Sequence, residues 1–483
     1  MISNPALADG ARPKQAHTAG SPARPERAII MGASMAGLSA ARILANYFDE
    51  VVLVERDQLG GVGEHRRGVP QARHSHGLLA SGLNTLNGLF PGMIQEAIDA
   101  GALPIDVMRD AHLCIGGGEH LRFESGFEGL LISRPLLEGL VRERVRSIAN
   151  IRLRDGCQVQ GLTATSDNNR VTGVRVNGDV LPAALVVDAT GRGSRSPVWL
   201  EGMGYGRPKE ERIEIDIAYA TRRFRRYPDH LNGALAAVIP PTSEDKRGGV
   251  MIAQENGAWI VSLNAYCGGS VPTELSAFVD YAKTIPAPYI YDVVSQAEPI
   301  GDAETFRFRA STRRRYESMS RFPEGYLVIG DAICCFNPAY GQGMSVAVLE
   351  ALELDKTVRM SSAGLARRFF RQVAKLVDTP WTIAAAGDLR FPEVPGRRTA
   401  LSCLRNWYLA RLHVGARHDP RLASAFQMVS SLLEPPQSLL RPSVIGRVLW
   451  SAYCRPPLHP RTRPDKLVTT VLEESRGDRL RAQ

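Results

Sequence analysis

Short apolar runs, each closed by a glycine or an acidic residue, recur along the chain. They cover residues 28–31, 51–54, 185–187 and 326–329. Such runs are typical of strands that are buried on both faces of a parallel sheet. An Ala- and Leu-rich stretch, residues 35–47, lies between the first two runs and predicts a helix. The pattern therefore predicts a βαβ unit near the start of the chain.

Residues 133–145 show the period of an amphipathic helix, with apolar side chains at positions 136, 137, 140, 141 and 145. Ser133 suits the N-cap of this helix, and Pro135 suits its first turn. Another helix is predicted to begin near His76, after a glycine-rich loop. Residues 151–162 and 171–187 predict a small meander of strands.

The middle of the chain predicts a second sheet. Residues 213–222, 248–252 and 259–263 predict strands, and residues 271–285 and 289–297 predict helices. An antiparallel sheet is the expected arrangement. From Phe391 onwards, apolar runs between prolines predict helices that pack on the first domain.

Composition places the chain among ordinary globular proteins. It has 483 residues, of which 44% are apolar and 23% are charged, and it is long enough for two or three domains. Seven scattered cysteines without a CxxC pair argue against a disulfide framework or a zinc site, and they favour a reducing cytoplasm. No run reaches the ~18 apolar residues of a membrane span. Residues 1–26 lack an apolar segment, so we expect a disordered tail rather than a secretion signal.

The net charge of +9 is unevenly distributed. Residues 391–483 contain 15 Lys and Arg against 7 Asp and Glu, a balance of +8, so the preceding 390 residues are nearly neutral. A basic segment suits weak contact with an anionic membrane surface or a carrier protein, although a solvated helical surface is the simpler interpretation. No nucleic-acid partner is expected, because aromatic residues do not alternate with arginines here.

The first βαβ unit carries a dinucleotide fingerprint, GASMAG, from Gly32 to Gly37. Gly32 permits the tight turn after the strand, and Gly37 lets the helix pack close to the sheet. Ser34 stands where the fingerprint has its second glycine. Glu55 follows 23 residues after Gly32, where a carboxylate accepts hydrogen bonds from a ribose. The alternative is an ordinary βαβ crossover with small residues for packing.

Two later stretches repeat this design. The apolar run at 185–187 ends in DATGRGSR, and the run at 326–329 ends in Gly330-Asp331. After an Asn337-Pro338 turn, Gly341-Gln-Gly343 opens a long helix. An acidic residue at a strand end and a glycine-rich helix start thus occur twice. This repetition predicts one long ligand that is held at both ends.

In this order and spacing, GASMAG, DATGRGSR and GDAICCFNPAYGQG resemble the FAD-dependent monooxygenases of the aromatic-hydroxylase fold, the group A flavoprotein monooxygenases. Within them, RRGVPQARHSHGLL is similar to the actinobacterial polyether epoxidases, which are akin to squalene epoxidase. The resemblance covers residues 27–388. It implies an α/β fold with a Rossmann-like FAD-binding domain of the glutathione-reductase type, a mixed-sheet substrate domain and a helical C-terminal segment. The corresponding residues are 27–204 with 315–390, then 205–314, and then 391–483.

The resemblance also implies which residues hold FAD. Glu55 and the fingerprint would bind the ADP half, Arg134 would reach the flavin chain, and Asp331 would bind the ribitol. The implied cofactor-binding residues are Gly32, Ser34, Met35, Ala36, Gly37, Glu55, Arg56, Arg73, Arg134, Val159, Asp331, Pro338, Gly341, Gly343 and Met344. Arg73 has an equally simple interpretation as a solvated loop residue. Cys334 and Ser345 depart from the family, where His and Asn are frequent.

The chemistry implied by the resemblance is addition of O2 to reduced flavin at C4a and transfer of one oxygen atom from that hydroperoxide to an apolar natural product of secondary metabolism. Electrons would come from NAD(P)H or from a partner flavin reductase. No His–Asp pair is recognisable in residues 205–314, which favours alkene epoxidation because a phenol would benefit from a general base. The catalytic residues are left open, and no metal is expected at His74 and His76 because a third ligand is missing.

Other functions of the same fold remain open at this stage. They are an aromatic hydroxylase, a flavin-dependent halogenase, a prenyl-chain reductase and a non-enzymatic FAD-binding scaffold. The halogenase signature WxWxIP is absent from the sequence. FAD is expected to bind non-covalently.

Overall fold

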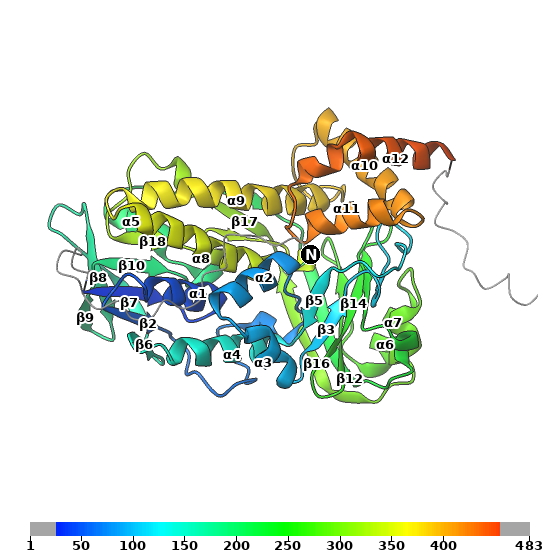
Figure 1. Cartoon of the computed structure of the whole chain (residues 1–483), viewed down its shortest axis with the longest axis horizontal. Helices are drawn as coiled ribbons and strands as arrows, with labels where there is room; N and C mark the ends of the chain where they lie inside the picture. The colour runs from blue at the N-terminus through cyan, green and yellow to red at the C-terminus, as the bar shows by residue number, and fades with distance from the viewer. Residues whose placement is uncertain (1–25, 455–483) are drawn as a thin grey trace, which may run out of the picture.

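The computed structural model describes residues 26–454 (Figure 1). The predicted N-terminal tail, apart from Glu26, and residues 455–483 of the C-terminal segment lie outside the described residues. Two hydrophobic clusters divide the buried side chains, one around a parallel sheet and one around a larger mixed sheet. In Figure 1 the parallel sheet lies on the left and the mixed sheet on the lower right.

The first layer is a five-stranded, fully parallel sheet in the order β18-β10-β1-β2-β6. Its strands are β1 (Arg27–Met31), β2 (Glu50–Val54), β6 (Ile151–Arg154), β10 (Leu185–Asp188) and β18 (Tyr326–Val328). The predicted βαβ unit is confirmed, since β1 and β2 pair in parallel and α1 (Met35–Leu44) connects them. The helix ends three residues earlier than predicted, because residues 45–47 form a turn.

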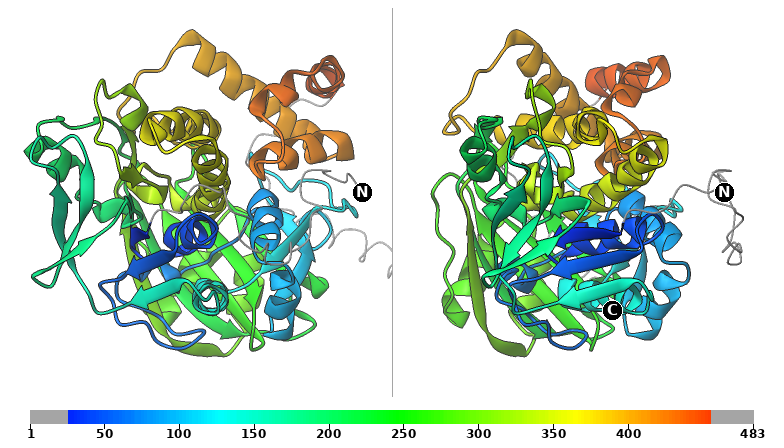
Figure 2. Two further views of the ribbon diagram at one scale, coloured as in Figure 1. Left: turned by 60° about the vertical axis from the view of Figure 1, so that its left-hand side comes forward. Right: turned by 90° about the vertical axis from the view of Figure 1, so that its left-hand side faces the viewer.

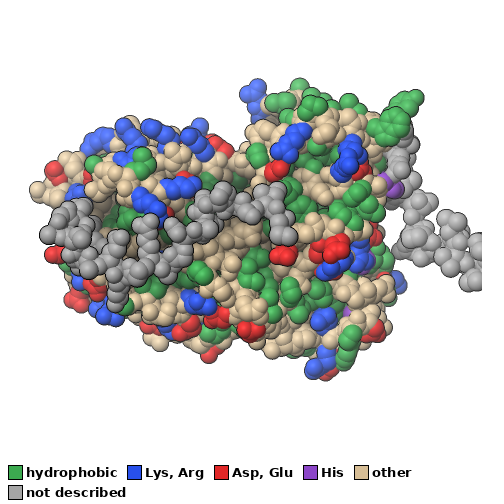
Figure 3. Space-filling model, viewed as in Figure 1, with side chains coloured by type: hydrophobic (Ala, Val, Ile, Leu, Met, Phe, Trp, Pro, Cys, Tyr) green, Lys and Arg blue, Asp and Glu red, His purple; other side chains and the backbone are tan. Residues whose placement is uncertain are grey.

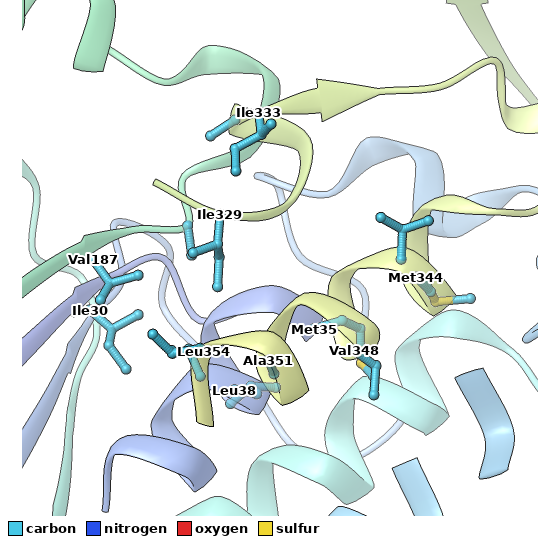
Figure 4. Packing of buried hydrophobic residues seen from close by; sticks show 14 of the residues in the cluster. Ile30, Met35, Leu38, Val187, Ile329, Ile333, Met344, Val348, Ala351 and Leu354 are labelled. Carbon is cyan, nitrogen blue, oxygen red and sulfur yellow. The ribbon is translucent and has the colours of Figure 1, made fainter. Parts of the chain in front are cut away.

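Helices cover this sheet. They are α1, α4 (Arg134–Arg146), α8 (Gly343–Met360) and α9 (Leu365–Asp388). Ser133 caps α4 as predicted, because its hydroxyl accepts a hydrogen bond from the Leu136 N–H at 3.3 Å. Figure 4 shows Leu38 of α1 beside Ala351 of α8 in the apolar cluster. These contacts bring the start of α1 and the start of α8, more than 300 residues apart in sequence, to one region of the fold.

Part of the predicted meander was wrong. Only β7 (Val159–Ala164), β8 (Val171–Val176) and β9 (Asp179–Pro182) form an antiparallel sheet of their own. The flanking strands β6 and β10 instead extend the parallel sheet on either side of the β1–β2 pair. The short strands look alike in sequence, and the long-range pairing decides to which sheet each belongs.

The second layer is a six-stranded sheet in the order β16-β12-β15-β14-β13-β4. It is antiparallel apart from the β13–β4 pair. The strands are β4 (Ala111–Leu113), β12 (Ile217–Arg225), β13 (Ala236–Ile239), β14 (Arg247–Gln254), β15 (Ala258–Ala265) and β16 (Pro299–Phe308). The predicted sheet in the middle of the chain is thus confirmed, and β4 joins it from much earlier in the sequence.

Smaller elements complete the fold. Two further sheets consist of β3 (Leu103–Asp106) with β5 (Glu128–Leu131), and of β11 (Lys209–Ile213), β17 (Ser311–Arg315) and β19 (Cys334–Cys335). The remaining helices of the first 300 residues are α2 (Ala80–Leu89), α3 (Met93–Asp99), α5 (Ser196–Gly202), α6 (Leu275–Lys283) and α7 (Tyr289–Val294).

The helix predicted to begin near His76 begins only at Ala80. Residues 70–73 form a short 3-10 helix, and the chain then runs extended, with Leu78 bridged to Leu130 of β5. The side chains of His74 and Ser75 are bonded to the six-stranded sheet. These contacts hold the segment out of a helix, which local propensity could not reveal.

The C-terminal helices are α10 (Ala400–Ala416), α11 (Pro420–Ser430) and α12 (Pro442–Cys454). The prediction that they pack on the first domain was wrong in the main. Most of their buried apolar side chains, among them Leu412, Leu422 and Val448, belong to the cluster of the six-stranded sheet. Figure 2 shows these helices together on one side of the molecule, next to α9. Between residues 26 and 454 no helix is both long and apolar enough to cross a membrane.

The predicted fold class is confirmed. A Rossmann-like α/β layer, a mixed-sheet layer and a helical C-terminal part are all present in the described chain (Figure 1).

Candidate active site

The turn after β1 shows why its glycines are required. Gly32 has φ +100°, and a Cβ there would lie 2.6 Å from the carbonyl oxygen of Ala189. A Cβ on Gly37 would lie 1.9 Å from the carbonyl oxygen of Gly32. The helix therefore sits directly against the turn, as close packing of a dinucleotide fingerprint requires. The first turn of α1 contains no acidic residue, and the side chain of Ser34 does not cap the helix. The N–H groups at the start of α1 therefore suit an anion.

A buried ionic network lies behind this turn. Glu55 accepts hydrogen bonds from the Ala33 N–H at 2.8 Å and from Arg66 Nη1 at 2.9 Å. Arg66 Nη2 lies 2.7 Å from Glu138 Oε1, and the side chains of both residues are almost fully buried. Arg134 Nε donates to Glu138 at 3.2 Å. The network thus connects the acid at the end of β2 to helix α4.

Ser34, at the second glycine position of the fingerprint, joins the network. Its hydroxyl donates to Glu138 Oε2 at 2.7 Å and accepts a hydrogen bond from Arg134 Nη2 at 2.8 Å. Sequence reasoning missed Arg66 and Glu138 as site residues. The signal was the Arg134–Glu138 spacing of four residues on one helix, with an arginine in the preceding glycine-rich loop.

The two acidic strand ends perform different tasks. Asp188 is fully buried and accepts hydrogen bonds from the Thr190 N–H at 2.9 Å and from the hydroxyl of Ser194 at 2.6 Å. It therefore shapes its own loop rather than facing a ligand. Asp331 lines the cavity described below, and burial raises the pKa of its carboxyl group, opposed by Arg192 and Arg134.

Asp388, the last residue of α9, hydrogen-bonds to the turn that precedes α8. Asp388 Oδ1 accepts hydrogen bonds from Asn337 at 2.8 Å and from the Tyr340 hydroxyl at 3.1 Å. Burial raises the pKa of Asp388 to about 7, although both hydrogen bonds oppose this. These hydrogen bonds fix Asn337 and Tyr340, and they thereby fix the turn that leads into α8. The first turn of α8 contains no acidic residue, so its positive end remains available to negative charge.

One cavity of about 2330 Å³ connects these features. Ordinary small-molecule pockets span about 300–1,000 Å³, so this cavity has room for a large cofactor and for a second ligand. One part of it is lined by the fingerprint, Glu55 and the loop that leads into α8. Another part is roofed by the six-stranded sheet with apolar side chains, namely Ala111, Leu113, Ala236, Val238, Val250 and Ile252.

Two histidines of the 70–79 loop bring polar atoms to the cavity. His74 Nδ1 lies 2.7 Å from Thr221 Oγ1, which lies 2.6 Å from Ser262 Oγ. His76 Nδ1 lies 2.9 Å from the carbonyl oxygen of His74, so Nδ1 donates and Nε2 of the neutral ring keeps its lone pair. Burial lowers the pKa of His74 to about 4, and burial together with Arg134 lowers that of His76 to about 3. Both rings are therefore neutral near pH 7.

The cavity brings together most of the residues that the resemblance implied. Those that line it are Gly32, Ser34, Met35, Ala36, Glu55, Arg56, Arg134, Val159, Asp331, Pro338, Gly341, Gly343 and Met344. Gly37 lies behind the lining, where it packs α1 on the turn. Arg73 is not among the lining residues, and its guanidinium pairs with Glu304 of β16. Within residues 26–454, no cluster of three or more His, Cys, Asp or Glu side chains could hold a metal ion.

The residues fit FAD. The cavity is lined by a glycine turn beside a buried carboxylate, and also by a second helix start whose first turn contains no acidic residue. The first of these features suits a ribose and pyrophosphate, and the second suits an electron-rich ring. Glu55 and the start of α1 would hold the ADP half, and Arg134 would reach the flavin chain. Asp331 and residues 341–344 would hold the flavin half.

Comparison with known proteins agrees with this geometry. The family described as FAD binding domain matches residues 26–368, well over half of the chain. Protein Rv3254 of Mycobacterium tuberculosis is 33% identical over 456 residues, which cover 88% of this chain and 93% of that protein.

Solved structures share the fold at low sequence identity. PqsL, a probable FAD-dependent monooxygenase from Pseudomonas aeruginosa, is 15% identical with a TM-score of 0.57, over 84% of this chain and 100% of that chain. The flavin-dependent brominase Bmp2 is 14% identical with a TM-score of 0.63, over 90% and 100%. 2-Methyl-3-hydroxypyridine-5-carboxylic acid oxygenase is 17% identical with a TM-score of 0.57, over 85% and 98%. At these identities the likeness shows the fold alone.

The epoxidase branch to which the motifs were compared is not distinguished by these similarities, which include an oxygenase and a brominase. The family match and the cavity geometry lead to the same class. The chain belongs to the FAD binding domain family and is an FAD-dependent oxidoreductase.

Proposed function

We propose that the protein is a monooxygenase that inserts one atom of O2 into an apolar, alkene-bearing natural product as an epoxide. The second oxygen atom leaves as water, and two electrons come from NAD(P)H or from a partner reductase. The observation that carries the proposal is the apolar part of the cavity under the six-stranded sheet. An apolar substrate fits this wall, and bound FAD would supply the oxygen chemistry beside it.

The chain's own residues contribute position and charge. The N-terminus of α8 directs N–H groups into the cavity and favours negative charge there, which supports the reduced cofactor. Asp388, Asn337 and Tyr340 fix the turn that precedes this helix. Val238, Val250 and Ile252 keep water from the space opposite the turn, and a dry wall protects reactive oxygen species from wasteful decay.

Aromatic hydroxylation is the second candidate, and a specific observation favours it. His74, Thr221 and Ser262 form a hydrogen-bonded chain whose two ends, His74 and Ser262, line the cavity, and the neutral imidazole has one ring nitrogen that can accept a hydrogen bond from a phenol. The sequence pattern of residues 205–314 contained no such base, because His74 reaches the sheet from the 70–79 loop. An epoxidation needs no such group, whereas oxygenation of a phenol benefits from one.

Turnover under 18O-labelled dioxygen tests both candidates. The FAD-loaded enzyme is given a polyene, a phenol of similar size, and either NAD(P)H or a flavin reductase. A labelled epoxide supports the proposal. An unlabelled product, or equal turnover without oxygen, overturns the monooxygenase function. A phenol that gains a labelled hydroxyl group would keep the monooxygenase function and exclude the epoxidase. A brominated product in the presence of bromide would assign halogenation instead.

The variant His74→Ala separates the two candidates further. Loss of phenol oxygenation with retention of epoxidation would place His74 as the base of the hydroxylase reaction. His65→Ala serves as the control, since His65 belongs to the same loop region but does not line the cavity.

A further inference from the structure

Large apolar side chains are exposed on the C-terminal helices. Leu401 is 74% exposed on α10, and Trp450 and Tyr453 are 71% and 87% exposed on α12. The same set includes Leu404 and Trp407 of α10, Leu440 before α12, and Leu449 of α12. Figure 3 shows hydrophobic side chains gathered over this lobe, interspersed with Lys and Arg. We call these seven residues the apolar face.

Helix geometry places these residues on continuous surfaces. Positions 401, 404 and 407 are three residues apart and share one side of α10, and positions 449, 450 and 453 share one side of α12. The two helices pack against each other. Contiguous exposed apolar surface of this kind marks a site of interaction with another protein or with a membrane.

Positive charge predominates around the apolar face, although Asp419 and Glu434 of the same lobe pair with Arg447 and Arg441. Residues 394–418 contain five arginines and residues 435–454 contain two, and neither stretch contains Asp or Glu. Arg411 lies over the ring of Trp407, with its guanidinium carbon 5.9 Å from the ring centroid. Arg397 and Arg405 are exposed, and within residues 26–454 neither has a hydrogen-bond or ion-pair partner. The face thus combines leucine and aromatic side chains with positive charge, part of which, at Arg397 and Arg405, has no ion-pair partner among residues 26–454.

The apolar face continues into the cavity. Leu401, Leu404, Trp407, Leu440 and Leu449 line it, although each is exposed to solvent. They therefore form the rim where the cavity meets the surface, next to residues 378–390 of α9 and its end. An apolar molecule that leaves this rim would meet the exposed leucine and tryptophan side chains first.

We propose that the apolar face docks onto an anionic lipid bilayer, so that the cavity opens toward the acyl-chain region. Helices that lie in a membrane interface have this composition, with Trp and Leu directed into the lipid and Arg beside the headgroups. A second copy of the chain fits less well, because a symmetric contact would bring the arginines of both copies together. Docking goes beyond the proposed reaction, and its test requires no turnover.

The test is flotation of the FAD-loaded full chain with vesicles of phosphatidylcholine alone, or with about one third phosphatidylglycerol. We expect binding to the anionic vesicles at about 0.1 M salt, and loss of most of it at about 1 M, where screening is strong. Trp450→Ser with Tyr453→Ser should reduce binding about tenfold or more. Arg397→Glu with Arg405→Glu should do the same.

Matched controls replace equally exposed residues elsewhere. They are Met360→Ser, which is 73% exposed at the end of α8, and Arg175→Glu on β8. All variants must retain bound FAD, which shows that they are folded. Failure of the wild-type chain to bind anionic vesicles overturns the proposal, as does equal loss in the controls. Equal binding to neutral and to anionic vesicles also overturns the proposal. A dimer that depends on Trp450, without vesicle binding, assigns the face to self-association instead.

Discussion

The hydroxyl of Ser34 donates a hydrogen bond to the carboxylate of Glu138 at 2.7 Å, although the two residues are 104 positions apart in sequence. This contact connects the fingerprint turn to helix α4. The Glu138 carboxylate also forms ion pairs with Arg66, Nη2 to Oε1 at 2.7 Å, and with Arg134, Nε to Oε2 at 3.2 Å. The serine that interrupts the fingerprint is therefore part of a charged network that positions two arginines at the cofactor cavity.

Replacing Glu138 with Ala should strongly destabilise the protein. The change leaves Arg134 without its carboxylate partner in a buried site, and losing one partner of a buried ion pair costs about 3–5 kcal/mol. Urea unfolding of the apoprotein measures the effect. Glu143→Ala is the control, because Glu143 pairs with Arg146 on the exposed side of the same helix and should change stability by at most about 1 kcal/mol. Equal effects of the two changes would contradict the structural role of the network.

Gly37→Ala should impair both folding and FAD binding. Its Cβ would lie 1.9 Å from a backbone oxygen, so α1 must move away from the turn. Overpacking of this kind costs about 1–3 kcal/mol or more. Gly202→Ala in α5 is the control, since a Cβ there meets no atom within 4 Å and alanine favours the helix. Thermal unfolding and flavin content report the result, and a stable, FAD-saturated Gly37→Ala variant would be inconsistent with the packing described.

Glu55→Ala should weaken FAD binding by about 1.5–3 kcal/mol, the range for hydrogen bonds to a charged group. The carboxylate lines the cavity and also holds the Ala33 N–H and Arg66. Its loss therefore removes a ribose acceptor and loosens the turn. Titration of the apoprotein with FAD measures the affinity, and Glu50→Ala, at the opposite end of β2 where Glu50 is half-buried beside Arg27, should leave it unchanged. An unaltered affinity for Glu55→Ala would show that its carboxylate does not contact the cofactor.

Glu350 makes stability depend on pH. This residue of α8 is fully buried and accepts a hydrogen bond from the Gly330 N–H, and burial raises its pKa to about 8 from an ordinary value near 4.5. Between these two values the folded chain binds a proton that the unfolded chain lacks. The contribution of Glu350 is therefore fully present below pH 4.5 and is lost as pH rises through about 8.

Glu350→Gln should remove this dependence, because glutamine keeps the acceptor oxygen and carries no charge. We expect the variant to be more stable than the wild type above pH 8, by up to about 5 kcal/mol, and similar to it near pH 4.5. Denaturant unfolding at several pH values gives the comparison. Parallel stability curves for the two proteins would contradict the raised pKa.

The purified protein should be yellow and should release its flavin on acid precipitation. The cavity residues that would hold FAD do so through hydrogen bonds and charge. Flavin that stays with the precipitate would reveal a covalent bond, for which His74, His76 and Cys334 are the residues to examine. Colourless protein that cannot take up FAD would contradict the assignment of the cofactor.

By itself, the sequence determined the elements that depend on neighbouring residues. The turn at Gly32, the helix packed at Gly37 and the N-cap at Ser133 are encoded within a few positions each, because tight turns and helix starts accept few residue types. The three glycine-rich motifs likewise specified the cofactor class.

The tertiary structure alone decided how distant segments meet. Glu138 reaches Ser34 and Arg66 only because α4 packs beside α1, and His74 enters the cavity only because its loop bonds to β12 and β15 instead of forming a helix. The C-terminal helices joined the core of the six-stranded sheet, while their apolar pattern suited either core equally well. Periodicity indicates which side of an element is buried, but it does not indicate which other element that side packs against. The packing partner depends on contacts between residues hundreds of positions apart. Local patterns carry no information about such contacts.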